Sequence, residues 1–509
     1  MKTCVKWVAC LALFFSACGS ALGFEPLQGH EAWVLKSRVV PTPTKMELAR
    51  EIVTLDNTLA LTLCVKKDQD KALKAVETFF PLWFAGQKPR VSCENLQEEI
   101  VPDGYKISAR GQTMRIAAES DSGILNALKT LRQLAEATRG TLKTVSFFVP
   151  EMEIDDAPKM AFRGIHVCWF PETAPERIEQ AIRMAAYYKY NYLVLEFWGV
   201  YPFEKYPEFC WKEYATTRAE VEKLVALGES LGIRLIPQIN IFGHASWSRI
   251  TSGKHTTLDF HPEFLPLFEP DGWTWCLSNP NTREVLSNMV LELCEVFDNP
   301  PFFHIGCDEA GPCATCIDCR RANYGELFVD HLKHFTNLLA ERNCRPMMWH
   351  DMLITRQQFP GYVANANTHT KDILGKLPKD LVVCDWQYGS PKENEQWSSM
   401  RFFKEQGFDV VACPWNNRAG VVSQAKTVCN AQLYGILVTT WHHLSGLDRM
   451  YTMFSVGAQS AWRADHPALT NDNFNAHIRQ IGWDMKLSEY DKTGVTDYQI
   501  PTQTSGSPH

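Results

Sequence analysis

The sequence lacks three features that mark particular classes of protein. It has no excess of positive charge, since 51 Lys and Arg stand against 58 Asp and Glu, and this argues against nucleic acid as a partner. Beyond the N-terminus no stretch holds 18 or more apolar residues, so the sequence predicts no further membrane span. Its 17 Cys are scattered along a 509-residue chain, which excludes a small disulfide-stapled scaffold. The 45% of hydrophobic residues instead predicts a globular protein with a packed core.

The N-terminus resembles an export signal. Lys2 and Lys6 form a basic segment before the apolar run Val8–Ala17. Two cleavage points stay open: one after Gly23, and one before Cys18, in a segment similar to a bacterial lipoprotein box. We expect residues 1–23 to be a signal peptide, and the protein to be exported by a bacterium. It would be periplasmic, secreted or an outer-membrane lipoprotein, with membrane anchoring only through an N-terminal lipid.

Residues 24–158 are predicted to form a small α+β domain. Alternating apolar residues predict strands, and apolar residues at helical spacing in Ser122–Glu136 predict a helix. The strands are expected at Leu61–Val65, Tyr105–Ala109 and Met114–Ala117. The segment Glu153–Pro158 is interpreted as a connector.

Residues 159–465 show a different rhythm, in which apolar strand candidates alternate with helical stretches. Eight strand–helix units of this kind predict an α/β fold, the (β/α)8 TIM barrel. Strands apolar on both faces suit a buried parallel sheet. The strands are expected at Phe162–Trp169, Tyr192–Phe197, Arg234–Asn240, Phe302–Asp308, Pro346–Met352, Leu381–Tyr388, Asp409–Asn416 and Gly435–His442. Helices are expected at Pro175–Tyr188, Arg218–Leu231, Thr282–Phe297 and Glu326–Arg342, and residues 466–509 are interpreted as a C-terminal tail.

Two adjacent acids, Asp308 and Glu309, end the fourth predicted barrel strand. The carboxyl end of a barrel strand faces the active-site mouth, which makes the pair a candidate catalytic centre. Successive strand residues point to opposite faces. Both acids can therefore reach one ligand only if the strand breaks near Asp308.

The segment His304–Glu309 resembles the catalytic motif of glycoside hydrolase family 20, the β-N-acetylhexosaminidases, and Cys307 before the acids is closest to hexosaminidase D-like members. Other segments resemble this family in the same order along the chain, and the resemblance spans about residues 100–465. These segments are Asn126–Gln133, Phe162–Gly164, Gly232–Pro237, Phe242–Ala245 and Trp349–Leu353.

This resemblance implies an exo-acting β-N-acetylhexosaminidase with a substrate-assisted, retaining mechanism, acting on a glycan with a terminal β-N-acetylhexosamine and without a cofactor or catalytic metal. Glu309 is implied as the general acid and base, and Asp308 as the group that holds the substrate's acetamide. Tyr388 could donate its hydroxyl to the acetamide oxygen, or be a core tyrosine. Arg163 is implied to bind sugar hydroxyls, with a structural ion pair as the alternative. The remaining substrate-binding candidates are His244, Trp349, Asp351, Trp386, Trp415 and Trp441.

Several positions depart from the family pattern. Cys168 and Asn240 stand where Asp is usual, His442 stands where Glu is common, and Glu196–Trp198 replaces a segment rich in His and Asp. These departures leave the preference for GlcNAc or GalNAc open. Two rival functions also stay open: a glycosidase of the same fold acting on a different amino sugar or modified glycan, and a catalytically silent carbohydrate-binding protein.

Three cysteines follow the acid pair at the spacing Cys313-x2-Cys316-x2-Cys319. Three thiolates could share a zinc ion with Cys307 or a His as the fourth ligand. Export of the chain favours a local disulfide instead. Zinc, a disulfide and free thiols all stay open.

Overall fold

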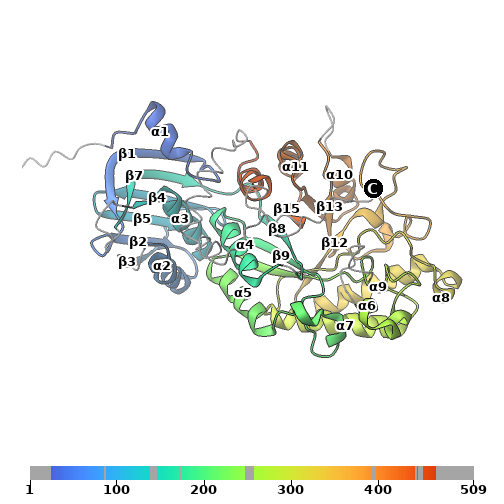
Figure 1. Ribbon diagram of the computed structural model, residues 1–509. Helices are drawn as coiled ribbons and strands as arrows, with labels where there is room; N and C mark the ends of the chain where they lie inside the picture. The colour runs from blue at the N-terminus through green and yellow to red at the C-terminus, as the bar shows by residue number, and fades with distance from the viewer. Residues whose placement is uncertain are drawn as a thin grey trace, which may run out of the picture.

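The computed structural model describes residues 24–84, 87–137, 146–171, 173–246, 257–390, 397–441, 444 and 451–465 of the 509-residue chain. The predicted signal peptide (1–23) and tail (466–509) lie outside these residues. The described chain forms two units: an N-terminal sheet with helices, and a closed barrel of eight parallel strands (Figure 1). No helix in the described part is long and apolar enough to cross a membrane.

The N-terminal sheet has the strand order β1-β7-β4-β5-β2-β3, and the short β6 pairs with β7. Its strands are β1 (Lys45–Thr54), β2 (Ala60–Val65), β3 (Arg90–Asn95), β4 (Tyr105–Arg110), β5 (Thr113–Ala118), β6 (Glu136–Ala137) and β7 (Phe147–Asp156). The connector predicted at Glu153–Pro158 is wrong in its first part. Residues up to Asp156 belong to β7 and pair with β4, because their alternating burial suits a sheet. The link to the barrel therefore begins after Asp156.

Helix α3 (Asp121–Leu134) lies between the sheet and the barrel (Figure 1). Every residue from Gly123 to Leu134 is buried, including polar ones, as expected for a helix covered on all sides. The Gln133 side-chain amide donates to the carbonyls of Val40 and of Tyr187, both at 2.8 Å. This one residue ties the N-terminal unit to a barrel helix. Helices α1 (Gly29–Lys36) and α2 (Gln69–Trp83) complete this unit.

The barrel closes in the order β10-β11-β12-β13-β14-β15-β8-β9. All eight predicted strands are present, and the predicted fold is confirmed. They are β8 (Phe162–Trp169), β9 (Tyr192–Phe197), β10 (Arg234–Gln238), β11 (Phe302–His304), β12 (Arg345–Trp349), β13 (Val382–Trp386), β14 (Asp409–Cys413) and β15 (Gly435–Thr439). Apolar side chains such as Phe162, Val194, Ile236 and Phe302 fill the interior, so the barrel is a packed core and not a pore.

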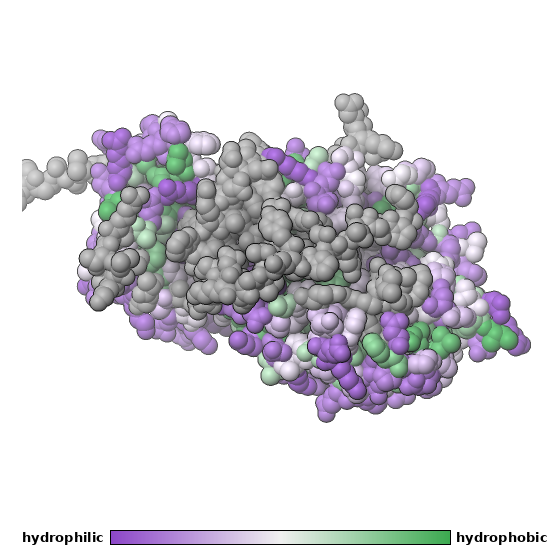
Figure 2. Space-filling view, viewed as in Figure 1, coloured by the Kyte–Doolittle hydropathy of each residue, from purple (hydrophilic) through white to green (hydrophobic). Residues whose placement is uncertain are grey.

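Helices cover the outside of the barrel, and the four predicted ones are present within two residues of the expected bounds. Helix α5 begins where the Thr217 hydroxyl accepts from the Glu220 N–H, and the Glu220 carboxylate accepts from the Thr217 N–H in return. The helices are α4 (Pro175–Tyr187), α5 (Arg218–Ser230), α6 (Thr257–Phe260), α7 (Pro280–Val296), α8 (Ile317–Arg321), α9 (Tyr324–Ala340), α10 (Ser398–Glu405), α11 (Arg418–Ala431) and α12 (Gly457–Trp462). The coloured side chains in Figure 2 are mostly hydrophilic, as expected for the outer faces of such helices.

Candidate active site

Strand β11 ends early, and the backbone then turns sharply to bring both acids to one place. The strand stops at His304, four residues before the predicted end. Gly306, Cys307 and Glu309 follow with φ values of +66°, +75° and +51°. A Cβ on residue 306 would lie 1.3 Å from the Asn240 side-chain oxygen, so only glycine fits there. This is the break that the acid pair requires, and left-handed residues of this kind cluster at functional sites.

Asp308 and Glu309 share the imidazole of His244. His244 Nε2 lies 3.3 Å from Asp308 Oδ2 and 3.1 Å from Glu309 Oε2. The Asn240 amide donates to Asp308 Oδ1 at 3.0 Å. Asp308 is buried, whereas the Glu309 side chain is 46% exposed. Asp308 is thus fixed inside the barrel, whereas the Glu309 side chain reaches solvent, where a substrate can contact it.

The Asp351 side chain fixes the position of the Glu309 backbone through a hydrogen bond. Its Oδ2 accepts from the Glu309 N–H and from the Asn365 amide, both at 2.9 Å, and its Oδ1 accepts from the Trp386 indole N–H at 3.2 Å. Burial and the nearby Asp308 charge raise the pKa of Asp351 to about 6. Asp351 has no exposed surface, so this geometry gives it a positioning contact in place of the predicted contact with substrate.

Aromatic side chains from the ends of β13, β14 and β15 form one wall. The Tyr388 ring lies 5.1 Å from the Trp386 ring and 5.2 Å from the Trp415 ring. The Trp441 indole donates to the Tyr388 hydroxyl at 2.8 Å. Burial raises the pKa of Tyr388 well above its usual range, so the hydroxyl keeps its proton. The fourth predicted tryptophan, Trp349, is fully buried below this wall, against His304 and Trp441.

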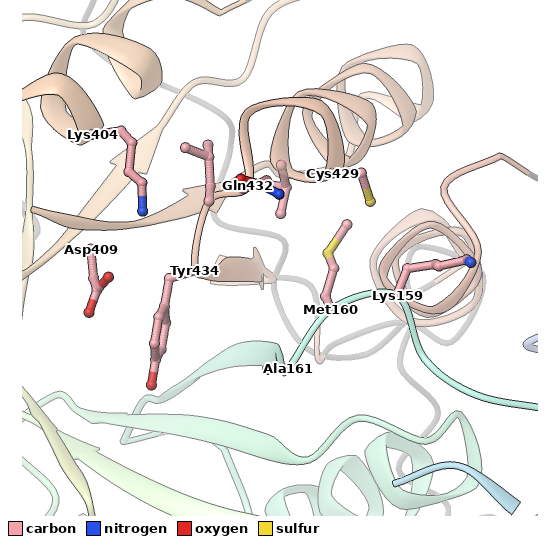
Figure 3. Close-up of a pocket in the computed structure, with 10 residues that line it drawn as sticks. Lys159, Met160, Ala161, Lys404, Asp409, Cys429, Gln432 and Tyr434 are labelled. Carbon is pink, nitrogen blue, oxygen red and sulfur yellow. The ribbon is translucent and has the colours of Figure 1, made fainter. Parts of the chain in front are cut away.

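A cavity of about 360 Å³ opens beside this wall and Glu309. Trp386 and Tyr388 line it together with Tyr362, Arg356 and Asn365. A larger cavity of about 530 Å³ lies elsewhere and contains none of the candidate site residues (Figure 3). Asp409 and Tyr434, which line it, stand at the starts of β14 and β15. Because TIM-barrel enzymes carry their sites at the carboxyl ends of the strands, the smaller cavity is the candidate active site.

The prediction that Arg163 binds sugar hydroxyls is wrong. Arg163 is the second residue of β8, at the opposite end of the barrel, and is 2% exposed. Its guanidinium lies 2.8 Å from Asp103 Oδ2 and donates to the Met160 and Lys189 carbonyls. It forms the structural ion pair that was the alternative.

The departures from the family pattern have local explanations. Asn240 orients Asp308 through its amide and accepts the Cys307 N–H at 2.8 Å. The Cys168 thiol lies 3.3 Å from the buried Glu196 carboxylate, which also accepts from the Gln238 amide at 2.7 Å and from the Trp198 indole at 3.1 Å. Glu196 is therefore engaged within the barrel wall. His442 lies outside the described residues.

Two residues of the site were missed from the sequence. The Trp273 indole donates to the Glu309 carbonyl at 2.7 Å, and its ring lies 4.2 Å from the His244 ring. The loop between Phe242 and Pro280 is rich in Trp, which marks the region but not the residue. Asn365, the partner of Asp351, follows no strand and has no signal in the sequence.

Comparison with known proteins places these features in a family. The chain matches "Glycosyl hydrolase family 20, catalytic domain" over residues 155–459 and "Glycosyl hydrolase family 20, domain 2" over residues 36–157. It is 23% identical over 348 residues to Beta-hexosaminidase 1 of Coccidioides posadasii, covering 59% of this chain and 52% of that protein. It is 25% identical over 174 residues to Hexosaminidase D of Homo sapiens, covering 32% and 34%. The chain spans about half the length of the first curated relatives it matches.

Solved structures of low sequence identity share the fold. A family 20 exo-β-N-acetylglucosaminidase from Vibrio harveyi, in complex with N-acetylglucosamine, has a TM-score of 0.67 at 17% identity, covering 93% of this chain and 79% of that one. A β-N-acetylhexosaminidase from Bacteroides fragilis has a TM-score of 0.64 at 17% identity, covering 90% and 96%. With a catalytic-domain match over most of the barrel and a domain 2 match over the sheet before it, the chain belongs to glycosyl hydrolase family 20.

Proposed function

We propose that the protein is an exo-acting β-N-acetylhexosaminidase that removes terminal β-linked GlcNAc or GalNAc with retention of configuration. The observation that carries this proposal is the acid pair bridged by one imidazole beside an aromatic cavity. The names of the related β-hexosaminidases support it. Family 20 is an exception among glycosidases because the substrate supplies the nucleophile.

In the first step the acetamido oxygen of the substrate attacks the anomeric carbon. Glu309 gives its proton to the glycosidic oxygen, the bond between that oxygen and the anomeric carbon breaks, and a cyclic oxazolinium forms. Asp308 accepts the acetamide N–H and balances the positive charge that develops on the ring. The positions fit these roles, since the half-exposed Glu309 lines the cavity and the buried Asp308 is held by Asn240.

In the second step water attacks the anomeric carbon and Glu309 takes its proton. The oxazolinium opens, and the product keeps the β configuration. The Tyr388 hydroxyl accepts a hydrogen bond from the Trp441 indole and donates a hydrogen bond to the acetamide oxygen. His244 holds the two carboxylates in register through both steps.

The test is the variant Glu309→Gln with an activated β-N-acetylhexosaminide. Turnover should fall by about 10²–10⁴-fold because the proton donor is lost. The matched control is Glu77→Gln, which changes an exposed glutamate on α2 of the N-terminal unit and should leave turnover unchanged. Wild-type turnover in the Glu309 variant would sink the assignment.

A substrate panel decides among the rival functions. Hydrolysis of β-GlcNAc and β-GalNAc without hydrolysis of the matching glucoside supports substrate assistance. Equal rates on the unacetylated glucoside, or failure of an oxazoline-type inhibitor to bind, contradict it. Tight glycan binding without turnover would favour a carbohydrate-binding protein. The departures from the family pattern at Cys168 and Asn240 are the reason for considering that rival.

We propose further that the chain is exported, which rests on the basic and apolar pattern of its first 23 residues. Mass spectrometry of the mature protein from its host tests this. A chain that begins at Phe24 indicates free export, one that begins at a lipid-modified Cys18 indicates anchoring, and an intact Met1 contradicts export.

A further inference from the structure

Three cysteine thiols converge beside the loop that carries Glu309. Cys276 stands four residues before α7, Cys316 caps the N-terminus of α8, and Cys319 lies within α8. The Cys276 sulfur lies 3.7 Å from the Cys316 sulfur and 3.8 Å from the Cys319 sulfur. Any two of the three sulfurs lie within 4.8 Å of each other. Such a cluster from two separate loops is a candidate metal site.

The sulfur spacing fits a metal better than a disulfide. Two thiolates bound at about 2.3 Å to a tetrahedral zinc ion lie about 3.8 Å apart, which is the spacing here. The sulfurs of a disulfide lie about 2.05 Å apart. A disulfide would also use only two of these three thiols, whereas one ion uses all three.

The surroundings of the sulfurs are those of a metal-binding turn. The backbone N–H of Cys319 points to the Cys316 sulfur at 3.3 Å, within the spacing Cys316-x2-Cys319. The Ser278 hydroxyl lies 3.1 Å from the Cys319 sulfur. Donors of this kind orient thiolates and offset their negative charge around an ion.

A buried carboxylate beside the thiols lacks a cationic partner among the described residues. Glu269 has no exposed surface, and its Oε2 accepts from the Thr315 N–H, the Thr315 hydroxyl and the Cys316 N–H. Within the same part of the chain its Oε1 has no hydrogen-bond partner. Burying a carboxylate is costly unless a positive charge compensates it. Buried carboxylates are paired or coordinate metals, and a divalent cation at the neighbouring thiols would give Glu269 a metal partner.

We propose that Cys276, Cys316 and Cys319 bind one zinc ion, and that the neighbouring Glu269 carboxylate, which lies outside the 4.8 Å cluster of the three sulfurs, turns toward the ion as the fourth ligand. This set differs from the one that spacing alone suggests. Cys313 stands apart and accepts from the Asn367 amide at 3.3 Å. The Cys307 thiol faces the Ile305 carbonyl at 3.4 Å, inside the barrel.

The ion would join the two loops that build the acid site. Cys276 follows Trp273, whose indole donates to the Glu309 carbonyl, and Cys316 follows the acid pair on the next loop. A zinc ion at this place would fix the loop that carries Cys276 relative to the loop that carries Cys316. It would not contact the substrate. It is a structural site, because four protein ligands leave no open position.

Zinc content decides the proposal directly in the wild-type chain. The whole protein is purified from zinc-supplemented cells under reducing conditions and measured by elemental mass spectrometry. One zinc per chain is expected, and cobalt exchanged into the same site should show thiolate-to-metal charge-transfer bands. Absence of zinc, together with no zinc uptake by the reduced chain, overturns the proposal. A disulfide between Cys276 and either partner in the protein isolated without reductant also overturns it.

Variants then assign the ligands. Cys276→Ser and Cys319→Ser should lose zinc, while Cys429→Ser, a half-buried cysteine on α11, should keep it. Glu269→Gln should still bind zinc, with affinity lower by at least about tenfold. Zinc retained in full by both cysteine variants refutes the assignment, and the wild-type measurement stands if a variant does not fold. Loss of hexosaminidase activity plays no part in the readout, so this proposal and the proposed function fail separately.

Discussion

At the amino-terminal end of the barrel, Asp156 and Lys189 form a fully buried ion pair, and the Trp462 indole and the Tyr105 hydroxyl donate to the same carboxylate. At the carboxyl end, Asp308 and Glu309 meet at one imidazole, and Asp351 lies close behind them. Both ends bury carboxylates. At the first end Asp156 and Lys189 have opposite charges in direct contact, whereas at the second end carboxylates of like charge gather on a strained backbone.

This contrast separates stability from function. The buried ion pair ties the barrel to the domain before it. At the carboxyl end, burial and the Asp308 charge raise the pKa of Asp351 to about 6, so this carboxylate can change its charge near neutral pH. Positive φ at His244, Glu309 and Trp441 places strain at the same end. Equivalent substitutions at the two ends should therefore have opposite consequences.

Among the variants that compare the two ends, the largest effect is expected for Asp308→Asn. This change removes the charge that balances the oxazolinium and keeps the shape, so kcat should fall by about 10²–10³-fold. The melting temperature should change little. Steady-state kinetics with a chromogenic β-N-acetylhexosaminide, and thermal unfolding of the same preparation, measure both. A large loss of stability with normal kcat would reverse the roles of the two ends.

Asp156→Asn should give the opposite result. It leaves Lys189 buried without its partner, which typically costs about 3–5 kcal/mol of stability. Burial already lowers the pKa of Lys189 to about 8 against the attraction of Asp156. Chemical denaturation measures the loss, and the folded fraction should keep its kcat. The control is Glu222→Gln, which breaks the exposed pair with Arg218 and should cost less than about 1 kcal/mol.

Asp351 should make the free energy of unfolding of the protein depend on pH. Its pKa in the folded protein, about 6, lies above the ordinary value of 3.8, so ionisation of Asp351 opposes folding. This contribution is complete below about pH 4, decreases as the pH rises to about 6 and is absent above, a change of roughly 3 kcal/mol. Denaturation between pH 4 and 7 should show this slope in the wild type and lose it in Asp351→Asn. Asp372→Asn, at an exposed carboxylate, should keep it, and an unchanged slope in Asp351→Asn would contradict the assignment.

The smallest effect compares two tryptophans that each donate one hydrogen bond. Trp441→Phe removes the donor to Tyr388, and Trp462→Phe removes the donor to Asp156. One hydrogen bond contributes about 1 kcal/mol. The first variant should lose about fivefold in kcat/KM with its stability kept, and the second should lose stability with kcat/KM kept. Equal effects of both variants on kcat/KM would remove the distinction between the two ends.

Much of the fold could be predicted, because apolar runs of strand length alternate with helical patterns. β8 and β9 have the predicted bounds. β11 ends four residues early because Gly306 and Cys307 take left-handed conformations, and local hydrophobicity carries no information about backbone handedness. Glu153–Asp156 was predicted as a connector because its charges hide an alternating pattern that only pairing with β4 reveals.

Most of the site could be predicted where a residue ends or follows a strand. Asp308, Glu309, Trp386, Tyr388, Trp415 and Trp441 are found this way, and His244 came from the resemblance of its loop to the family. Arg163 was wrongly predicted as a site residue. As the second residue of β8 it lies at the amino-terminal end of the barrel, opposite the active site. Cys276 lies 40 residues from Cys316 in the chain, and Asn365 lies on an irregular loop. Contacts between distant loops have no local signature, so these two residues could come only from the structure.

The closure of the barrel has a consequence for synthesis. β8 is the first barrel strand to leave the ribosome, and its second neighbour, β15, is among the last, with Thr440 donating to His166 across 274 residues of chain. Until β15 is made, one edge of β8 has no strand to pair with, and such edges invite aggregation. The sheet before the barrel can be complete long before that moment. The nascent barrel therefore keeps an unpaired edge for most of its synthesis, until β15 can join β8.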